Sequence, residues 1–256
     1  MGNATDTSRS ILVVIATLGV IAFNWMAAVG RVNNVTPESV SAKYPTPITP
    51  AGYTFAIWSL IYLGLIVFSI YQALPKNRER FRAVRTVYIA SCVLNCGWIY
   101  FWHHNMILVC LGVIVLLAAT LLFINVKLKK SATYAEYWAA SAPFGIYFGW
   151  VTAASIVNFA VALNYLGVKM SAASETVFGV VCILIAAALG VIVRVRLRNY
   201  LYPLAIAWAL TGIGVKQSGQ TLIVAAAAVG TVAGLIAACS FVMDLNSSIS
   251  PKTANE

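Results

Sequence analysis

Apolar residues occur in eight long runs separated by short polar segments, and this alternation dominates the chain. A hydrophobic run of about 20 residues is long enough to cross the hydrocarbon core of a bilayer as a helix. We therefore predict an all-α integral membrane protein with about eight transmembrane helices. The expected spans cover residues 11–30, 51–71, 86–102, 106–126, 134–163, 171–193, 200–215 and 221–245.

Three of these runs also carry aromatic and polar residues at helical spacing. Residues at i, i+3, i+7 and i+11 lie on the same side of a helix. Three faces of this kind indicate that the helices form a bundle and that these residues together line one interior pocket. The three sets are Phe55, Trp58 and Tyr62; Asn95, Trp98 and Trp102; and Tyr147, Trp150 and Asn158.

The N-terminal part of the chain contains one long connection. The first run is longer than the apolar part of a signal peptide and contains Asn24 and Trp25, which favours a retained span. Four prolines within residues 31–50 predict that the connection to the second span is not helical. This connection is a candidate lid over the lining.

Composition supports a membrane protein, since 61% of the 256 residues are apolar and only 9% are charged. The net charge of +10 does not indicate nucleic-acid binding, because the basic residues lie in short clusters between apolar runs. Thirteen of the 17 Lys and Arg residues fall on one side of the eight-span arrangement. The positive-inside rule then places both termini in the cytoplasm, with basic loops that contact anionic lipids.

The spans lack the residues that ion coupling or catalysis requires. We expect no Asp, Glu, Lys or Arg deep in a span, and we find no Ser/His/Asp set, carboxylate pair or phosphate loop. The five cysteines lie in apolar runs and are expected to be free thiols. His103 and His104 are interpreted as a solvated turn, and Trp102, Trp138 and Tyr200 as interfacial belt residues. We predict no enzyme activity, no metal and no required cofactor.

Three motifs in order resemble the translocator protein family (TspO/MBR, the tryptophan-rich sensory proteins). The second span opens in a pattern similar to that family's Pro-x-Gly-Trp-x-Phe, the third contains Leu-Asn-x-x-Trp, and the fifth contains Pro, an aromatic residue, Trp and then Asn. The matching residues are Pro50, Gly52, Tyr53, Phe55, Trp58 and Tyr62; Leu94, Asn95 and Trp98; and Pro143, Phe144, Trp150 and Asn158.

The resemblance divides the chain into four parts. Residues 1–10 are a cytoplasmic N-terminal segment, 11–165 resemble the family's five-helix bundle, 166–245 add three transmembrane helices, and 246–256 are a polar tail. The chain departs from the family pattern in three ways: Tyr53 replaces a usual Trp, the spacing differs in the second and fifth spans, and the last three spans have no counterpart in the five-helix form.

The resemblance implies a pocket for a planar hydrophobic ligand, such as a porphyrin, a haem-type compound or another tetrapyrrole, used in sensing or as a carrier. Flat aromatic faces suit a planar macrocycle, and asparagine side chains can hydrogen-bond its edge. The predicted ligand-binding residues are Tyr53, Phe55, Trp58, Tyr62, Asn95, Trp98, Tyr147, Trp150 and Asn158.

Other interpretations remain open for the same residues. The tryptophans can serve core packing, the asparagines can hold helices together, and Tyr53 can be an interfacial anchor. The protein as a whole can be a passive transporter of a small apolar solute or an assembly subunit of a membrane complex. A homodimer or complex is suggested by the small residues of the eighth span, with Gly230 and Gly234 expected against a partner helix.

Overall fold

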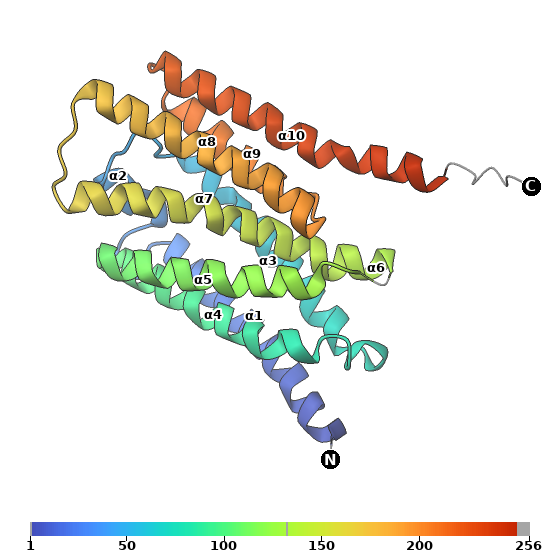
Figure 1. Cartoon of the computed structure of the whole chain (residues 1–256). Coiled ribbons are helices and arrows are strands. Elements are labelled where there is room, and N and C mark those ends of the chain that lie inside the picture. Colours follow the sequence, from blue (N-terminus) through green and yellow to red (C-terminus); the bar gives the residue numbers. More distant parts are fainter. Residues whose placement is uncertain (1, 132, 250–256) are drawn as a thin grey trace, which may run out of the picture.

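The computed structural model describes residues 2–131 and 133–249, with side chains described for residues 6–131 and 133–240. Most of the predicted polar tail lies outside this range. The described chain is a helical bundle (Figure 1). Its elements are α1 (Gly2–Ala28), α2 (Pro37–Lys43), η1 (Gly52–Ala56), α3 (Ile57–Ala73), η2 (Pro75–Asn77), α4 (Arg82–His103), α5 (Ile107–Leu128), α6 (Tyr134–Glu136), η3 (Tyr137–Ser141), α7 (Ala142–Tyr165), α8 (Ala172–Leu197), α9 (Leu201–Lys216) and α10 (Thr221–Ile249).

The helices confirm a multi-pass membrane protein. Seven helical stretches of the described chain are long and apolar enough to cross a bilayer. The further apolar helix, α9, has 16 residues and would be about 24 Å long. Figure 1 shows that α9 carries the chain from the end of the bundle where α8 ends to the end where α10 begins. A path from one end of the bundle to the other is that of a transmembrane helix. The predicted number of eight transmembrane helices stays a prediction.

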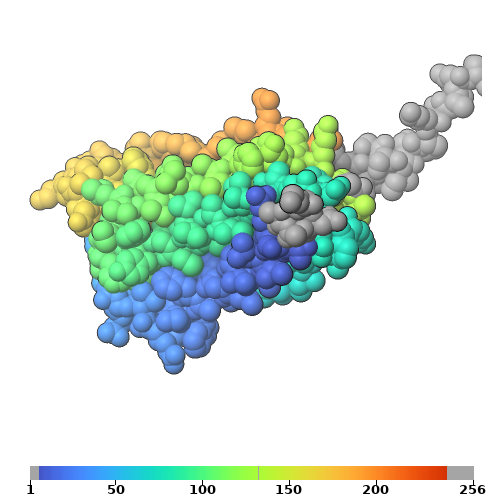
Figure 2. Space-filling model, turned by 90° about the horizontal axis from the view of Figure 1, so that it is seen from below, coloured from blue at the N-terminus to red at the C-terminus, as the bar shows by residue number. Residues whose placement is uncertain are grey.

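The connection between the first two spans is partly helical, which corrects the sequence prediction. Pro37 lies in the first turn of α2, where its missing N–H has no intrahelical partner to lose. Thr36 caps the helix by accepting a hydrogen bond from the Ser39 backbone N–H at 3.3 Å. The helix ends before Pro45. Figure 2 shows this connection (light blue) as a shoulder at the end of the molecule.

Pro143 lies inside a continuous helical stretch, residues 134–165, as predicted. The chain accommodates it with a π-helical turn, η3, directly before α7. A proline cannot donate to the preceding turn, and a local π turn changes the pairing of the freed carbonyl groups. Gly64 of α3 lies against Pro143, where a β-carbon would stand 2.8 Å from the proline Cβ. The crossing of α3 and α7 therefore depends on a glycine.

Close backbone approach also joins the last three helices to the rest of the bundle. A β-carbon on Gly149 of α7 would lie 2.5 Å from the Tyr202 carbonyl oxygen of α9. Gly212 of α9 leaves equally little room beside Thr54. The Trp208 indole donates to the Thr54 carbonyl at 2.8 Å, and the Ala51 N–H donates to Gly212 at 3.0 Å. Helix α9 is thus an integral part of the bundle.

The two glycines of α10, Gly230 and Gly234, face inward, which corrects their predicted role. A β-carbon on Gly230 would meet Leu210 at 2.6 Å, and one on Gly234 would meet the Pro203 carbonyl oxygen at 3.0 Å. Both contacts are to α9 of the same chain. These glycines therefore serve packing within the chain rather than docking of a partner helix.

Two arginines that the sequence assigned to loops are buried near the ends of α4 and α8, which corrects that assignment, although neither lies deep in a span. Arg85 is fully buried in α4, where it donates to the Gln72 side chain at 2.7 Å and lies 3.8 Å from Asp6. Arg194 in α8 donates to Ser240 of α10 at 2.8 Å and lies over the Tyr200 ring. Each charge is retained because a neighbouring helix supplies partners.

Candidate functional site

The three predicted aromatic faces meet in one cluster centred on Trp58 of α3. Its ring is stacked on Tyr62, with centroids 5.6 Å apart. It lies 6.1 Å from Trp98 of α4, 5.9 Å from Tyr147 and 6.3 Å from Trp150, both of α7. These separations fall within the range of favourable aromatic pairs. The spacing argument therefore identified residues that are neighbours in the fold.

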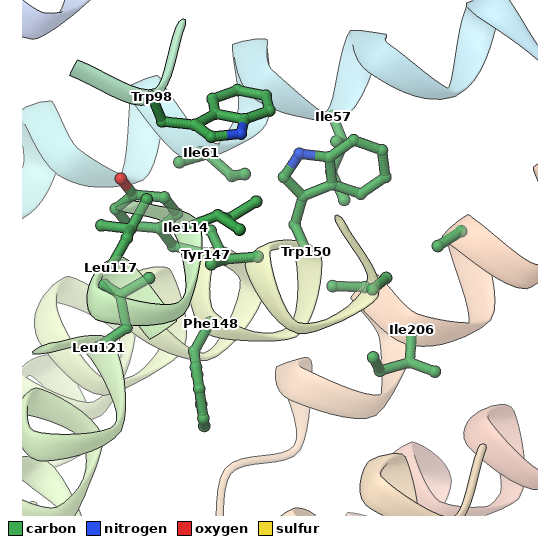
Figure 3. Close-up of a cluster of buried hydrophobic side chains, with 14 of the residues drawn as sticks. Ile57, Ile61, Trp98, Ile114, Leu117, Leu121, Tyr147, Phe148, Trp150 and Ile206 are labelled. Carbon is green, nitrogen blue, oxygen red and sulfur yellow. The ribbon is translucent and has the colours of Figure 1, made fainter. Parts of the chain in front are cut away.

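Figure 3 shows how the two sides of α7 differ. Tyr147 and Trp150 point toward α4, and the indole rings of Trp98 and Trp150 turn their nitrogen atoms toward each other. Phe148 points away from them, and its ring centroid lies 5.0 Å from that of Tyr202 on α9. One face of α7 thus belongs to the aromatic cluster, while the other holds the C-terminal helices.

Hydrogen bonds connect the buried asparagines to the rings. Asn95 is fully buried and donates to the Tyr147 hydroxyl at 2.9 Å. Asn24 of α1 donates to the Asn95 side-chain oxygen at 2.7 Å. The Trp98 indole donates to the Asn158 side-chain oxygen at 3.2 Å. These bonds fix the orientation of both faces and join α1 to the cluster, a role for Asn24 that the motifs did not predict.

The Trp150 indole is different, because its N–H has no hydrogen-bond partner among the described residues. The residue is only 4% exposed, and its nitrogen atom is buried. A buried donor without an acceptor costs about 1–3 kcal/mol. Trp150 is therefore the one ring of the cluster whose polar atom is buried without a partner.

An aromatic cavity lies beside the cluster. Its volume is about 30 Å³, which is enough for a water molecule. Helix α9 closes part of its wall. Its lining includes Phe55, Trp98, Trp102, Trp150, Asn158, Ala209 and Ile213.

A larger side groove of about 440 Å³ runs between α1 and α3 under α2. This volume lies within the range of small-molecule sites, about 300–1,000 Å³. Phe55 lines both the aromatic cavity and the side groove, so its ring stands between the two spaces. The groove is lined by residues including Asn24, Trp25, Glu38, Tyr53, Trp58, Ser59 and Tyr62.

The nine predicted residues divide by burial. Asn95, Trp98, Tyr147, Trp150 and Asn158 are buried; Phe55, Trp58 and Tyr62 are half-buried along the side groove. Tyr53 is 47% exposed and packs edge-on against Trp208, with centroids 5.6 Å apart. The structure brings all nine to the cavity, the cluster or the groove.

Two neighbouring predictions are corrected. Trp102, assigned to the interfacial belt, is 3% exposed, lines the aromatic cavity and donates to the Pro37 carbonyl at 3.1 Å. His103, assigned to a solvated turn, is fully buried at the end of α4, with Nδ1 2.7 Å from the Ile99 carbonyl oxygen. Both are covered because the α2 connection and α1 close over the end of α4. His104 is exposed, as predicted.

The α2 connection also makes polar contacts across the mouth of the site. The Tyr44 hydroxyl donates to the Asn105 side-chain oxygen at 3.3 Å. The phenol is protonated at neutral pH and can donate, and burial raises the pKa of Tyr44 further above its usual value. Within the described residues no group of three His, Cys, Asp or Glu residues could hold a metal ion. The cavity and the groove therefore offer rings, amides and hydroxyls, together with the Glu38 carboxylate in the groove.

The fold and the site together define a multi-pass helical membrane protein with an aromatic-lined cavity. The chain belongs to the TSPO-like protein family, whose model matches residues 10–241. This match extends beyond the five helices that carry the motifs and includes α8, α9 and most of α10. No curated protein and no solved structure gives a significant match to the chain.

Proposed function

We propose that this TSPO-like protein binds a planar hydrophobic ligand, a porphyrin or related tetrapyrrole, and acts as a sensor or carrier. The observation that carries the proposal is the unpartnered Trp150 indole N–H beside the aromatic cavity. An acceptor atom on a ligand would relieve its desolvation, while the surrounding rings would stack on a flat macrocycle.

The aromatic cavity and the side groove would act as one binding site. The closed cavity is too small for a macrocycle, whereas the groove is large enough for part of one. Since Phe55 lines both, rotation of its ring would join the two spaces. The α2 connection would then act as a lid. With both termini in the cytoplasm, this lid lies on the opposite side of the membrane.

A titration of the purified protein with protoporphyrin tests this function. Tryptophan fluorescence and pigment absorbance are followed together for the wild type, Trp58→Ala and Trp150→Phe. Trp138→Phe is the matched control, because Trp138 is 45% exposed and lies outside the cavity and the groove. We expect saturable quenching of the wild type by protoporphyrin. The affinity should be roughly 3- to 10-fold lower in Trp58→Ala and Trp150→Phe. Absence of saturation in folded protein, or equal weakening in Trp138→Phe, would contradict the proposal.

A further inference from the structure

A third hollow lies at the end of the bundle that carries the α2 connection, between the first five spans and the last three. We name it the vestibule. It has a volume of about 460 Å³ and is open and polar at its rim. Its wall combines Thr46 and Pro47 with Asn164 at the end of α7, Glu175 of α8, and Lys216 and Gln217 at the end of α9.

The vestibule and the aromatic cavity are separated by a small apolar space of about 10 Å³. This space shares Ala153, Val157, Ala209 and Ile213 with the wall of the aromatic cavity. On its other side it is lined by Ile48, whose chain neighbours Pro47 and Thr49 line the vestibule. The small apolar space therefore adjoins the aromatic cavity, and residues 47–49 link its lining to that of the vestibule.

One short segment, residues 45–50, lines all three spaces. It begins at the vestibule, and Pro50 lines the aromatic cavity. Ile48, between these two ends of the segment, is 1% exposed and lines the small apolar space. The Thr49 N–H donates to the Thr46 carbonyl at 3.1 Å, so the segment closes on itself as a turn.

Few bonds hold this turn to the helices beside the vestibule. The Asn164 side chain donates to the Pro45 carbonyl at 2.9 Å, and the Gln217 side chain donates to the Thr46 carbonyl at 3.0 Å. Both donors are flexible amides at helix ends, and Asn164 is exposed to solvent. Toward the side groove, the ring between the two spaces is Phe55, which packs edge-on against Trp150 with centroids 6.0 Å apart. On the vestibule side, displacing the turn requires breaking these two side-chain bonds.

We propose that the vestibule is the entrance to the aromatic cavity and that the turn at residues 45–50 is its gate, with Ile48 as the plug. The inference rests on the proposed function. It assigns a role to α8 and α9, two of the last three spans, because they form one wall of the route. The ligand class is an amphipathic ring compound. Its polar edge passes the hydroxyls, amides and opposite charges of the vestibule, and its apolar body enters the cavity.

A native thiol reports on the gate without any ligand. Cys182 is buried and lines the small apolar space next to Ile48, whereas Cys110 is fully buried elsewhere in the core. In a Cys96→Ser, Cys239→Ser background, the protein in nanodiscs is treated with a charged, water-soluble methanethiosulfonate. Mass spectrometry then gives the modification rate of each remaining thiol.

We expect Ile48→Ala to accelerate modification of Cys182 at least roughly tenfold, because it removes the plug. Asn164→Ala and Gln217→Ala each remove one latch bond and are expected to accelerate it roughly 3- to 10-fold. Ile21→Ala, on the wall of the side groove, is the matched control and should leave the rate unchanged. Faster modification of Cys182 alone in these three variants supports the gate. An unchanged modification rate of Cys182, or an equal increase in the modification rate of Cys110, contradicts it.

Association of protoporphyrin provides the second readout. Faster association in Gln217→Ala supports entrance through the vestibule, with Leu116→Ala as the unchanged control, since Leu116 is exposed on α5 and lines none of these spaces. Faster association in Ile21→Ala alone assigns the entrance to the side groove and overturns the inference. If no variant binds protoporphyrin, the proposed function fails, while the thiol rates still decide whether the gate exists.

Discussion

Two buried polar regions at opposite ends of α4 differ in what their hydrogen bonds achieve. Around Arg85, the side chains of Gln72, Ser10 and Asp6 surround the charge and join α1, α3 and α4. Around Trp98 and Trp150, hydrogen bonds orient the rings. Arg85 Nη1 and the Trp150 N–H both lack a hydrogen-bond partner among the described residues, but Arg85 Nη1 lies 3.8 Å from the Asp6 carboxylate, whereas the Trp150 N–H lies beside a cavity. The first arrangement is that of a structural clamp, and the second is that of a binding site.

The largest expected effect is on the clamp. Arg85→Met removes a buried charge, takes one hydrogen-bond donor from the Gln72 side chain and leaves part of the Asp6 charge unpaired, which should destabilise the fold by about 3 kcal/mol. Thermal unfolding in detergent measures this change. Protoporphyrin affinity of the folded protein should be unaltered. A stable Arg85→Met protein with lost affinity would reverse the roles assigned to the two regions.

The next effect tests whether α9 is integral to the site. Gly149→Ala places a β-carbon against the Tyr202 carbonyl oxygen and should cost about 1–3 kcal/mol. Gly112→Ala is the matched control, because a β-carbon there meets nothing within 4 Å. It should be neutral or stabilising by up to about 1 kcal/mol, since alanine favours helix. Equal unfolding temperatures for the two variants would show that α9 does not pack closely on α7.

A smaller effect is expected from the asparagine link. Asn95→Leu removes the bonds to Asn24 and Tyr147, and each such bond in a membrane is worth about 0.6 kcal/mol on average. We expect a loss of roughly 1 kcal/mol in unfolding free energy, together with weaker protoporphyrin binding because Tyr147 is released. If the variant loses stability but keeps its affinity for protoporphyrin, Asn95 has a structural role like that of Arg85 and does not contribute to binding.

The smallest effect is expected at the groove. Tyr62→Phe keeps the ring that stacks on Trp58 and removes only the hydroxyl. Protoporphyrin affinity should change by less than about tenfold, the value of one ordinary hydrogen bond. The same titration measures it. A complete loss of binding would show that the hydroxyl, not the stacking, determines recognition.

The sequence predicted the spans well because their signal is local. Apolar length identifies a helix that can cross a bilayer, and helical spacing correctly grouped Trp58, Trp98 and Trp150 on facing sides. Trp102 belonged to the same spacing pattern, yet its position near a span end suggested the interface. Its burial depends on α2, a helix that prolines made hard to predict.

Burial supplied by distant helices could not be predicted in the same way. Arg85 and Arg194 resembled loop charges because their partners lie on other helices. The sequence did not indicate that Ala209 and Ile213 line the cavity, because every face of α9 carries small or apolar residues. The contacts of Gly230 likewise required the positions of α8 and α9.

A titration of Ala154→Leu with protoporphyrin tests the central claim most directly. Ala154 lines the aromatic cavity, and a leucine there would fill space that a ligand needs. We predict that saturable binding is lost while the unfolding temperature stays equal to or above that of the wild type. Unchanged affinity in this variant would contradict a ligand site in the aromatic cavity.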